Sequence, residues 1–589
     1  MENRQSVTLK RLSRLARIAS VSACLVSGAL VSPGFGQSLP KAYAPGTARI
    51  LPVVAQNGMV VSQEAAASQI GLDILKRGGN AVDAAIAVGF ALAVTLPRAG
   101  NIGGGGFMLV HLAKDHRDIA IDYREIAPLA TTKDVFLDEK GEAVPAKSQT
   151  SGLGVGVPGT VAGLALASRY GSGNFSLAAL IAPAQKLARD GIAVEADLAD
   201  SLTSSQTFLS RFPSTAAVYF PNGSAPKRGD ILKQPDLANT LAAIGEQGPA
   251  AFYTGPVAAK IAAAVQSAGG RMAVEDLAAY AALEREPVRG QYRGYDIVSM
   301  PPPSSGGIHV IEILNILEGF PLGQMGQGSA ATIHLMAEAE KLAFADRSEY
   351  LGDPAFVKIP VKGLTSPKYA AELRATISAD KARPSADIKP GKPAPYESDQ
   401  TTHFSVVDAD GNAVSNTYTL NFNYGLGLIA EGTGVMLNNE LDDFAAKPGA
   451  ANGYGLTGGD ANAPAPNKRP LSSMSPTFVF KNGELVLVTG SPGGSHIITT
   501  VVQMIVNVLD FGMNVAAAAE AVRVHHQWLP DQLQVEPGLS LDTIRALEAK
   551  GHKVVPQPAG GSAQSIHRAD GVLMGEADQR QRGTLAAGY

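Results

Sequence analysis

Residues 399–420 read DQTTHFSVVDADGNAVSNTYTL and decide the fold. The β-branched and aromatic residues of 401–407 and 413–420 are typical of strands, and the turn sequence DADGN between them predicts a β-hairpin. A threonine hydroxyl is a weak nucleophile unless a base lies beside it. A cut before Thr401 would supply the residue's own α-amine, whose ordinary pKa of about 7.7–8 suits neutral pH. Thr401 is therefore a candidate nucleophile, although two threonines at a strand start are more often structural.

A second hairpin follows downstream and leads into a glycine-containing loop. The segments TFVF (477–480) and ELVLV (484–488) flank an Asn-Gly turn, SPGGSH comes next, and an apolar helix is predicted over 497–509. Amide groups at a helix start lack intrahelical partners, and glycine allows a substrate to approach closely. Gly493 and Gly494 therefore form a candidate oxyanion hole, although a tight turn alone would also use glycine.

The upstream part of the chain predicts a mixture of helices and antiparallel strands. Helices are expected over 63–77 and 81–92, and residues 117–126 alternate between apolar and polar in the manner of a strand. The Ala- and Leu-rich middle, 160–350, reads as helical. Residues 380–400 are rich in Pro, Lys and Asp without periodicity, which predicts an exposed linker or loop.

The composition is that of a folded globular protein. Among 589 residues, 45% are hydrophobic and 17% charged, which excludes a disordered chain. The formal net charge of −4 is not basic enough to indicate a nucleic-acid partner.

The N-terminal segment, residues 1–36, has the pattern of a secretory signal peptide. A basic start is followed by an apolar run from Ile18 to Ser32 that is short for a membrane span, so an uncleaved anchor is the weaker alternative. The single cysteine, Cys24, lies inside this segment. The mature chain then has no disulfide, cysteine nucleophile or cysteine-ligated zinc. Export to a bacterial periplasm or to the medium is expected.

No metal or cofactor is expected from sequence motifs. The ten histidines form no H-E-x-x-H spacing, and the chain has neither a G-x-S-x-G elbow nor a Walker motif. The glycine run GNIGGGGF precedes a predicted strand instead of following one, so it does not fit a dinucleotide fingerprint.

Long, ordered strings resemble the γ-glutamyltranspeptidase family from about residue 50 to the terminal AAGY. Downstream they are TTHFSVVDADGNAVSNTYTLN, LNNELDDFAAKPG, GGDANAPAPNKRPLSSMSPT and VTGSPGGSHIITTVVQM; upstream they are KRGGNAVDAAIAV, GNIGGGGFMLV, DYREIAP and VPGTVAGL. The resemblance implies an α+β fold of the N-terminal-nucleophile hydrolase type, a four-layer αββα sandwich. It also implies a precursor that cuts itself between Gln400 and Thr401. The large subunit is then 37–400 and the small subunit 401–589, together forming one αββα unit.

The resemblance assigns the reacting groups. Thr401 would be the nucleophile for self-cleavage and for turnover, and Thr419, in the partner strand of the hairpin, would orient it. Gly493 and Gly494 would form the oxyanion hole. A strand threonine chosen for its β-propensity is the plain alternative for Thr419.

The resemblance also implies a pocket that matches both charges of a γ-glutamyl group. Arg124 offers a bidentate fork to the α-carboxylate, and Ser472 and Ser473 can add hydroxyl donors. The α-ammonium group calls for acceptors, which Asn421, Glu440 and Asp443 can supply; some family members have Gln at the position of Glu440. Residues 447–459 resemble a loop that covers the pocket in bacterial members, with Tyr454 as its contact. Structural alternatives are a local pair of Arg124 with Asp122 or Glu125, a loop or cap role for the serines, a solvated acidic loop and a mobile glycine-rich loop.

The sequence therefore predicts an exported γ-glutamyltransferase and glutathione hydrolase. Its partners would be glutathione and other γ-glutamyl compounds, with amino acids or peptides as acceptors, and the enzyme would be a heterodimer cut from one precursor. One alternative is a glutaryl-cephalosporin acylase on the same scaffold. Asp443 argues against it, because a glutaryl group has no ammonium for an acid to meet. The other alternative is an uncleaved, non-catalytic binding homologue, against which the intact TTH junction argues.

Overall fold

Two seven-stranded antiparallel sheets form the centre of the protein. The computed structural model describes residues 50–393, 403–558 and 560–589, all within the compact unit Pro40–Tyr589. The first sheet has the order β21 (Leu585–Gly588), β2 (Met59–Ser62), β10 (Phe404–Val407), β11 (Ala413–Thr419), β3 (Gly105–Leu112), β4 (Arg117–Tyr123) and β7 (Leu283–Arg285). The second has the order β1 (Val53–Ala55), β20 (Val572–Ala577), β19 (Gln564–Ala569), β15 (Glu484–Thr489), β14 (Thr477–Lys481), β9 (Tyr295–Ser299) and β8 (Val288–Tyr292).

Each sheet combines strands from both sides of residue 400. In the first sheet, β10 lies between β2 and β11, and β11 lies between β10 and β3. In the second sheet, β14 pairs with β9 on one side and with β15 on the other. The predicted large and small subunits therefore both contribute strands to each sheet.

Alternating side chains give each sheet one face toward the helices and one toward the other sheet. In the first sheet, Val60 and Met108 belong to the core beneath the helices, whereas Met59 and Phe107 belong to the core between the sheets. The second sheet does the same, with Val479 and Leu487 facing its helices and Phe478 and Val488 facing inward. Three apolar layers thus separate four layers of structure.

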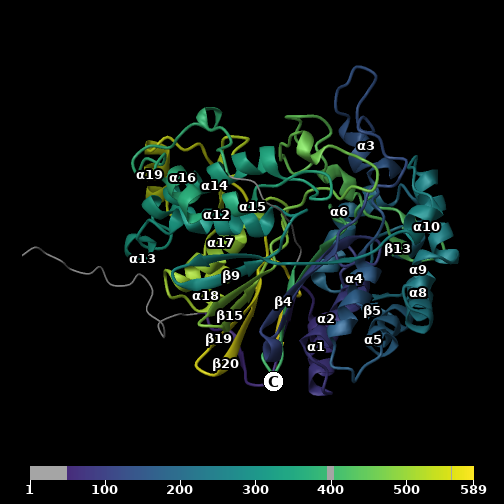
Figure 1. Cartoon of the computed structure of the whole chain (residues 1–589). Helices are drawn as coiled ribbons and strands as arrows, with labels where there is room; N and C mark the ends of the chain where they lie inside the picture. The colour runs from purple at the N-terminus through teal and green to yellow at the C-terminus, as the bar shows by residue number, and fades with distance from the viewer. Residues whose placement is uncertain (1–49, 394–402, 559) are drawn as a thin grey trace, which may run out of the picture. The chain divides into compact units, whose positions relative to one another are not determined.

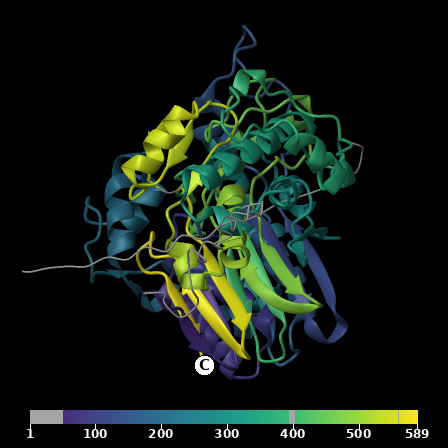
Figure 2. The ribbon, with the colours of Figure 1, turned by 90° about the vertical axis from the view of Figure 1, so that its left-hand side faces the viewer.

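Helices cover the outer face of each sheet (Figure 1). Over the first sheet lie α1 (Ala65–Lys76), α2 (Ala81–Thr95), α4 (Thr160–Ala167), α5 (Leu177–Asp190) and α8 (Pro235–Gln247); over the second lie α12 (Gly306–Leu317), α14 (Ala330–Tyr350), α17 (His496–Leu509) and α18 (Val515–Glu520). Figure 2 looks toward the second sheet, whose C-terminal strands are yellow. The sequence-based prediction of an αββα sandwich is confirmed.

Helix α2 shows how composition fits the central position of this layer. All 15 of its residues are buried, because it packs against α1 and α5 as well as the sheet. Its many alanines allow these close approaches, since small side chains keep the helix surfaces near one another. Its start is fixed by a capping box in which the Asn80 side chain accepts from the Asp83 N–H and the Asp83 carboxylate accepts from the Asn80 N–H.

The remaining elements border these layers. The helices are α3 (Pro145–Gln149), α6 (Ala196–Leu209), α7 (Pro213–Tyr219), α9 (Ala250–Tyr253), α10 (Pro256–Ser267), α11 (Val274–Ala278), α13 (Leu322–Met325), α15 (Val361–Leu364), α16 (Pro367–Arg374) and α19 (Leu541–Ala549). The strands are β5 (Ile192–Ala193), β6 (Ile231–Leu232), β12 (Ile429–Ala430), β13 (Val435–Met436), β16 (Val524–His525), β17 (Leu533–Val535) and β18 (Val554–Pro556). No helix within the described ranges is long and apolar enough to cross a membrane.

Both predicted hairpins are present. Strands β10 and β11 pair with Phe404 opposite Asn416, and the Asp408 carboxylate accepts from the N–H groups of Asp410 and Asn412 in the turn. Strands β14 and β15 pair as expected, with an irregularity between Val479 and Phe480. Helix α17 begins at His496, one residue before the predicted start.

Two expectations about the middle of the chain are wrong. The region 160–350 is not helical throughout, because residues 283–299 form β7, β8 and β9. The reason is that a few short strands are hidden in a long window dominated by Ala and Leu. The loop after residue 380 is not simply exposed: Ala382, Ser385 and Ile388 are buried, and Ser385 Oγ donates to Asp531 over 2.8 Å. The signal segment 1–36 and residues 394–400 lie outside the described residues.

Candidate active site

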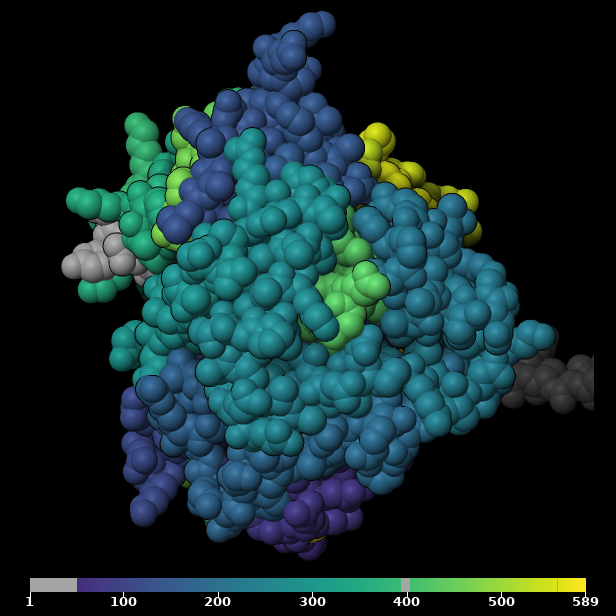
Figure 3. Space-filling view, turned by 90° about the vertical axis from the view of Figure 1, so that its right-hand side faces the viewer, coloured from purple at the N-terminus to yellow at the C-terminus, as the bar shows by residue number. Residues whose placement is uncertain are grey.

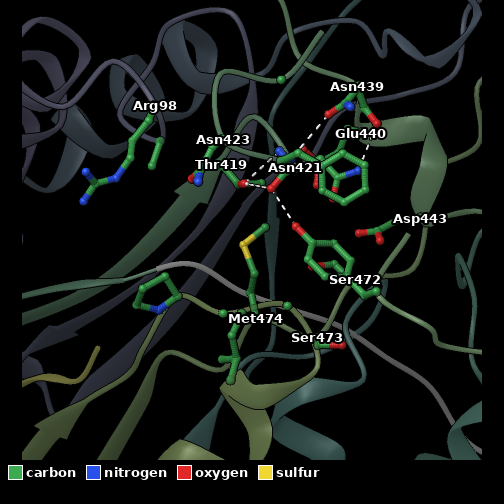
Figure 4. A pocket seen from close by; sticks show the side chains of 18 of the residues that line it. Arg98, Thr419, Asn421, Asn423, Asn439, Glu440, Asp443, Ser472, Ser473 and Met474 are labelled. Atoms are coloured by element: carbon green, nitrogen blue, oxygen red, sulfur yellow. Dashed lines mark hydrogen bonds between the residues drawn. The ribbon is translucent and has the colours of Figure 1, made fainter. Parts of the chain in front are cut away.

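A cavity of about 650 Å³ lies where the end of β11 meets the start of α17. Its walls come from loops that both sheets hold in place, and Figure 4 shows many of the side chains. The residues that line it are Gln63, Arg98, Ala99, Gln149, Thr150, Phe208, Tyr418, Thr419, Asn421, Phe422, Asn423, Gly425, Asn439, Glu440, Asp443, Tyr454, Leu456, Ser472, Ser473, Met474, Pro492, Gly493, Gly494, Ile497, Gly560 and Gln581. Nine of the predicted site residues are in this set, which brings together parts of the chain far apart in sequence.

One wall carries two acids that hold a buried guanidinium. Glu440 and Asp443 begin and end a single 3₁₀ turn, so both can face the same side. Behind them lies Arg124, which directly follows β4 and is fully buried. Its Nη1 donates to Glu440, its Nη2 donates to Asp443 Oδ2 over 2.7 Å, and its Nε donates to the carbonyl of Pro470 over 3.1 Å. Arg124 does not itself line the cavity.

The acids of this cluster outnumber its cation. Glu125 is fully buried, with its carboxylate 3.9 Å from Arg124 Nη1, as a third acid beside Glu440. Burial raises the pKa of Glu440 to about 7, and Asp443 adds to the rise while Arg124 opposes it. Burial also raises the pKa of Asp443 and, further, that of Glu125. Burial therefore favours the protonated form of these acids, and a positive charge arriving beside them would favour their ionised form.

A hydrogen-bonded loop closes over the acids. Tyr454 Oη donates to the carbonyl of Asn421 over 2.6 Å, and Asn421 Nδ2 donates to the carbonyl of Asn439 over 3.0 Å (Figure 4). Gln527 Nε2 donates to the carbonyl of Tyr454 over 3.2 Å. Tyr454 and Leu456 of the loop 447–459 thus line the cavity, and the covering role of this loop stays a prediction.

Two glycines also line the cavity. Gly493 and Gly494 have φ of 130° and 57°, and a Cβ on Gly493 would lie 1.8 Å from the carbonyl oxygen of Gly560. A Cβ on Gly494 would lie 2.4 Å from the ring of Tyr454. Only glycine fits these positions. The described residues accept no hydrogen bond from either amide, so both remain available at the cavity wall.

The serine pair is held from behind by α14 and the start of α12. Ser305 Oγ donates to the carbonyl of Ser472 over 2.8 Å, and Arg347 donates to the hydroxyls of both Ser305 and Ser473. Sequence reasoning missed Arg347, because nothing in the pattern of a long helix indicates that one arginine in its last turn reaches a distant loop. It also missed Asn439, although this residue stands in the NNELDDF string itself.

Gln400 and the predicted nucleophile Thr401 lie outside the described residues. Thr419 lines the cavity at the end of β11, and its Oγ accepts from the Asn421 N–H over 2.8 Å. The first described residue after the junction, His403, is buried between the sheets; its ring contacts Ser405 Oγ and the Gln564 carbonyl over 2.6 and 2.9 Å. His403 therefore anchors the chain two residues beyond Thr401.

A histidine cluster away from this cavity has ligand-like spacing. His334, Glu338 and His552 are buried, with one possible ligand atom from each within 4.8 Å of the others. The two histidines are hydrogen-bonded to each other over 2.7 Å, and the Lys341 ammonium pairs with Glu338 over 2.5 Å. A lysine ammonium would repel a cation at this place, so the contacts describe a polar network inside the fold.

A second cavity of about 380 Å³ lies between α7, α8 and the β12–β13 hairpin. Figure 3 shows this side of the molecule, where green residues near 430 stand in a hollow among the blue and teal segments. Its wall includes Lys233, Asp236 and Glu431, and it shares no residue with the larger cavity.

The fold and the acid-lined cavity define a class, the N-terminal-nucleophile hydrolases, and comparison narrows it. A family model described as γ-glutamyltranspeptidase matches residues 67–588. The glutathione hydrolase proenzyme of Escherichia coli is 55% identical over 581 residues, covering 98% of this chain and 99% of its own length. The chain belongs to the γ-glutamyltranspeptidase family, which confirms the prediction made from its motifs.

Two solved structures place the chain among related enzymes. The γ-glutamyltranspeptidase of Helicobacter pylori is 46% identical, with a TM-score of 0.55, and covers 56% of this chain and 95% of its own. A cephalosporin acylase from Bacillus halodurans is 32% identical, with a TM-score of 0.82, and covers 93% of this chain and 98% of its own. The fold is thus shared by enzymes of two named activities. The side chains that line the cavity are the feature that distinguishes these activities.

Proposed function

We propose that this protein is an exported, self-cleaving γ-glutamyltransferase and glutathione hydrolase. The observation that carries the proposal is that Glu440 and Asp443 line the same cavity as Gly493 and Gly494. The first pair suits an ammonium group, and the second suits the oxyanion of an amide under attack. A γ-glutamyl amide carries both groups on one short chain. The relative named glutathione hydrolase proenzyme supports the same donor and a maturation by cleavage.

Maturation would begin with Thr401. Its hydroxyl oxygen attacks the carbonyl carbon of Gln400, the peptide C–N bond breaks, and an ester forms while the nitrogen becomes the α-amine of Thr401. Water then hydrolyses the ester, leaving the Gln400 carboxylate and a free Thr401 hydroxyl. The products are the large subunit 37–400 and the small subunit 401–589, held together as a heterodimer.

Turnover would use the same hydroxyl with the new α-amine as its base. The amine takes the hydroxyl proton as Thr401 attacks the γ-amide carbonyl, and it returns the proton to the leaving amine. The amides of Gly493 and Gly494 stabilise the oxyanion, and Thr419 orients the nucleophile. Water then releases glutamate, or the amine of an amino acid or peptide gives a new γ-glutamyl compound.

Donor recognition would divide between the two charges of the glutamyl group. Asn421, Glu440 and Asp443 would accept from the α-ammonium, and the hydroxyls of Ser472 and Ser473 would donate to the α-carboxylate. Arg124 would add its charge from behind the wall. Tyr454 would cover the bound donor.

The second candidate is a glutaryl-cephalosporin acylase, favoured by the likeness to the Bacillus halodurans acylase. A glutaryl group carries the carboxylate and lacks the ammonium. It would leave Asp443 and Glu440 desolvated beside a methylene, which costs free energy. The acid-rich wall therefore favours the glutamyl donor.

The test is a denaturing gel of the purified protein with N-terminal sequencing of the smaller band. Cleavage predicts pieces of about 38 and 20 kDa, in proportion to 60.8 kDa for the whole chain, with the smaller one beginning Thr-Thr-His. Thr401→Ala should stay a single chain and have no activity, because the nucleophile is gone. A single band in the unmutated protein after long incubation would overturn the proposal and support an uncleaved binding homologue. Secretion of the chain, and its loss when residues 1–36 are deleted, would test export.

A further inference from the structure

A buried cation lies behind the serine pair, and the proposed reaction does not use it. Arg347 is in the last turn of α14 and is 5% exposed. Its Nε donates to Ser305 Oγ over 2.9 Å and its Nη2 donates to Ser473 Oγ over 3.2 Å. Both partners are neutral hydroxyls. Among the residues that the structure describes, no carboxylate lies within ion-pair distance of this guanidinium.

A guanidinium buried among neutral groups is unfavourable unless an anion arrives. Burial lowers the pKa of Arg347 to about 10, with Asp443 opposing the shift and Arg124 adding to it, so the side chain stays protonated at neutral pH. Arg124 is different, because two carboxylates already hold it. Among the described residues of this wall, Arg347 is therefore the cation without a hydrogen-bonded acid. Removing its charge from water without such a partner costs free energy.

The contacts of Arg347 converge on the serine pair. Ser305, which accepts from Arg347, donates to the carbonyl of Ser472 through its Oγ and through its backbone N–H, over 2.8 and 3.1 Å. The backbone of Ser472 is thus fixed through Ser305. The hydroxyl of Ser473 is fixed directly: because its oxygen accepts from Arg347, its own proton remains to be donated, and Ser473 lines the cavity.

We infer that Arg347 is a positioning residue for the α-carboxylate of the donor. It turns the Ser473 hydroxyl proton toward the cavity and places a matching positive charge behind it. The inference rests on the proposed function, which assigns the donor carboxylate to Ser472 and Ser473. It adds that the charge for this carboxylate comes from α14, a helix in the outer layer over the second sheet, as well as from Arg124.

Three donors separate this role from general damage to the fold. A γ-glutamyl anilide carries both charges, a glutaryl anilide carries only the carboxylate, and a 4-aminobutyryl anilide carries only the ammonium. Arg347→Met should raise KM for the first two by about ten- to a hundredfold, the range expected for a lost charge-assisted hydrogen bond. Turnover of the 4-aminobutyryl anilide should stay within about twofold of wild type, since this donor offers no carboxylate.

Conservative and control variants sharpen the result. Arg347→Lys keeps the charge and loses the fork to Ser305 and Ser473, so its KM should lie between those of wild type and Arg347→Met. In a Ser473→Ala background, Arg347→Met should raise KM much less than it does alone, because the two residues act as one unit. Arg374→Met is the matched control: Arg374 donates to the backbone carbonyls of Asn315 and Ile316, away from the cavity, and all three donors should be unaffected.

The outcomes are distinguishable. Equal losses on all three donors in Arg347→Lys and Arg347→Met, or additive losses with Ser473→Ala, would overturn the inference and leave the proposed function standing. A wild-type protein that does not turn over the γ-glutamyl anilide would overturn the proposed function itself. Arg347→Lys carries the donor comparison if Arg347→Met fails to fold, and the two cleavage bands report folding in each variant.

Discussion

The two ends of the cavity differ in how their charged side chains are paired. At the donor end, formed by Asn421, Glu440, Asp443, Ser472 and Ser473, buried acids outnumber the one guanidinium that they hold. At the far end, the charges are already matched: Arg98 pairs with Asp197, and Gln63 Nε2 donates to Gln581 Oε1 over 2.5 Å. Figure 4 shows Arg98 and Asp443 on opposite sides of Thr419 and Asn421.

This difference in charge pairing indicates which end of the cavity recognises its ligand by charge. A cationic ligand favours the ionised form of acids that outnumber their buried cation, so the donor end should discriminate strongly by charge. The far end has a cation already satisfied, amide groups and the ring of Phe208, which suits leaving groups and acceptors of varied structure. Substitutions at the two ends should therefore differ in size.

The largest effect is expected at Arg124. Arg124→Met leaves Glu440 and Asp443 facing each other without their cation, and losing one partner of a buried ion pair costs about 3–5 kcal/mol. The value of kcat/KM for a γ-glutamyl anilide should fall at least about a hundredfold. Arg124→Lys keeps the charge and loses the fork, so KM should rise while self-cleavage continues. Wild-type kinetics in Arg124→Lys would show that the donor end does not depend on this guanidinium.

The next effect is a change of donor preference at Asp443. Asp443→Asn removes a charge at nearly constant volume, and a charge-assisted contact to the donor ammonium is worth roughly 1.5–3 kcal/mol. Turnover of γ-glutamyl amides should fall by about one to two orders of magnitude, and the gap to glutaryl amides should narrow. The measurement is kcat/KM for both donors with both proteins. An unchanged ratio would reduce Asp443 to an acid of the loop, and equal wild-type rates on both donors would favour the acylase.

A smaller effect, dependent on pH, is expected at Glu440. Burial raises the pKa of this group to about 7 from a usual value of 4.5, so the folded protein favours the protonated form. The contribution of the Glu440 side chain to folding stability is complete below pH 4.5, its usual pKa. This contribution is lost as pH rises through about 7, its pKa in the folded protein. Glu440→Gln has no such loss. Near pH 4.5, the melting temperature of Glu440→Gln should equal that of wild type. At pH 8 it should be about 1–3 °C higher than that of wild type.

The control for this experiment is Glu431→Gln, which changes an exposed acid at the second cavity. Its melting temperature should follow that of wild type across the same pH range. A melting temperature of Glu440→Gln that runs parallel to wild type from acid to alkaline pH would mean that Glu440 stays ionised in its pair with Arg124.

The smallest effect is expected at the far end. Arg98→Gln removes a buried cation that lies outside the donor end, and water reaches its partner Asp197, whose side chain is 23% exposed. KM for the γ-glutamyl donor should stay within about twofold of wild type, and the rate of transfer to amino acid acceptors should change by no more than about threefold. A tenfold rise in donor KM would remove the distinction between the ends.

Sequence patterns predicted the parts of this molecule that are local in the chain. Both hairpins, helix α17 and the glycines before it depend on side chains within a few positions of one another, and the structure has them where expected. The pairing of Arg124 with Glu440 and Asp443 was not predicted from the residues, since local partners, Asp122 and Glu125, stand beside it in the sequence. The fold brings residues more than 300 positions apart into contact, and no periodicity encodes that distance.

The contribution of α14 illustrates the same limit. Arg347 lies in a long helix whose residues are buried over most of its length, so its spacing gives no sign of function. Its role depends on the loop of Ser472 and Ser473 meeting the start of α12, a tertiary arrangement. The strands β7 to β9 were missed for another reason, because they are short and stand within an Ala- and Leu-rich region.

The presence in each sheet of strands from both sides of residue 400 has a consequence for the stability of the protein after cleavage. As one chain, the protein can unfold and refold as a unimolecular reaction. After a cut between Gln400 and Thr401, each sheet consists of strands from two separate polypeptides. Neither polypeptide has a complete sheet or core of its own. Refolding then requires two partners to meet and becomes dependent on concentration. The cut enzyme would stay folded because it unfolds slowly, which is kinetic stability. The single-chain precursor does not depend on it, because it can refold by itself.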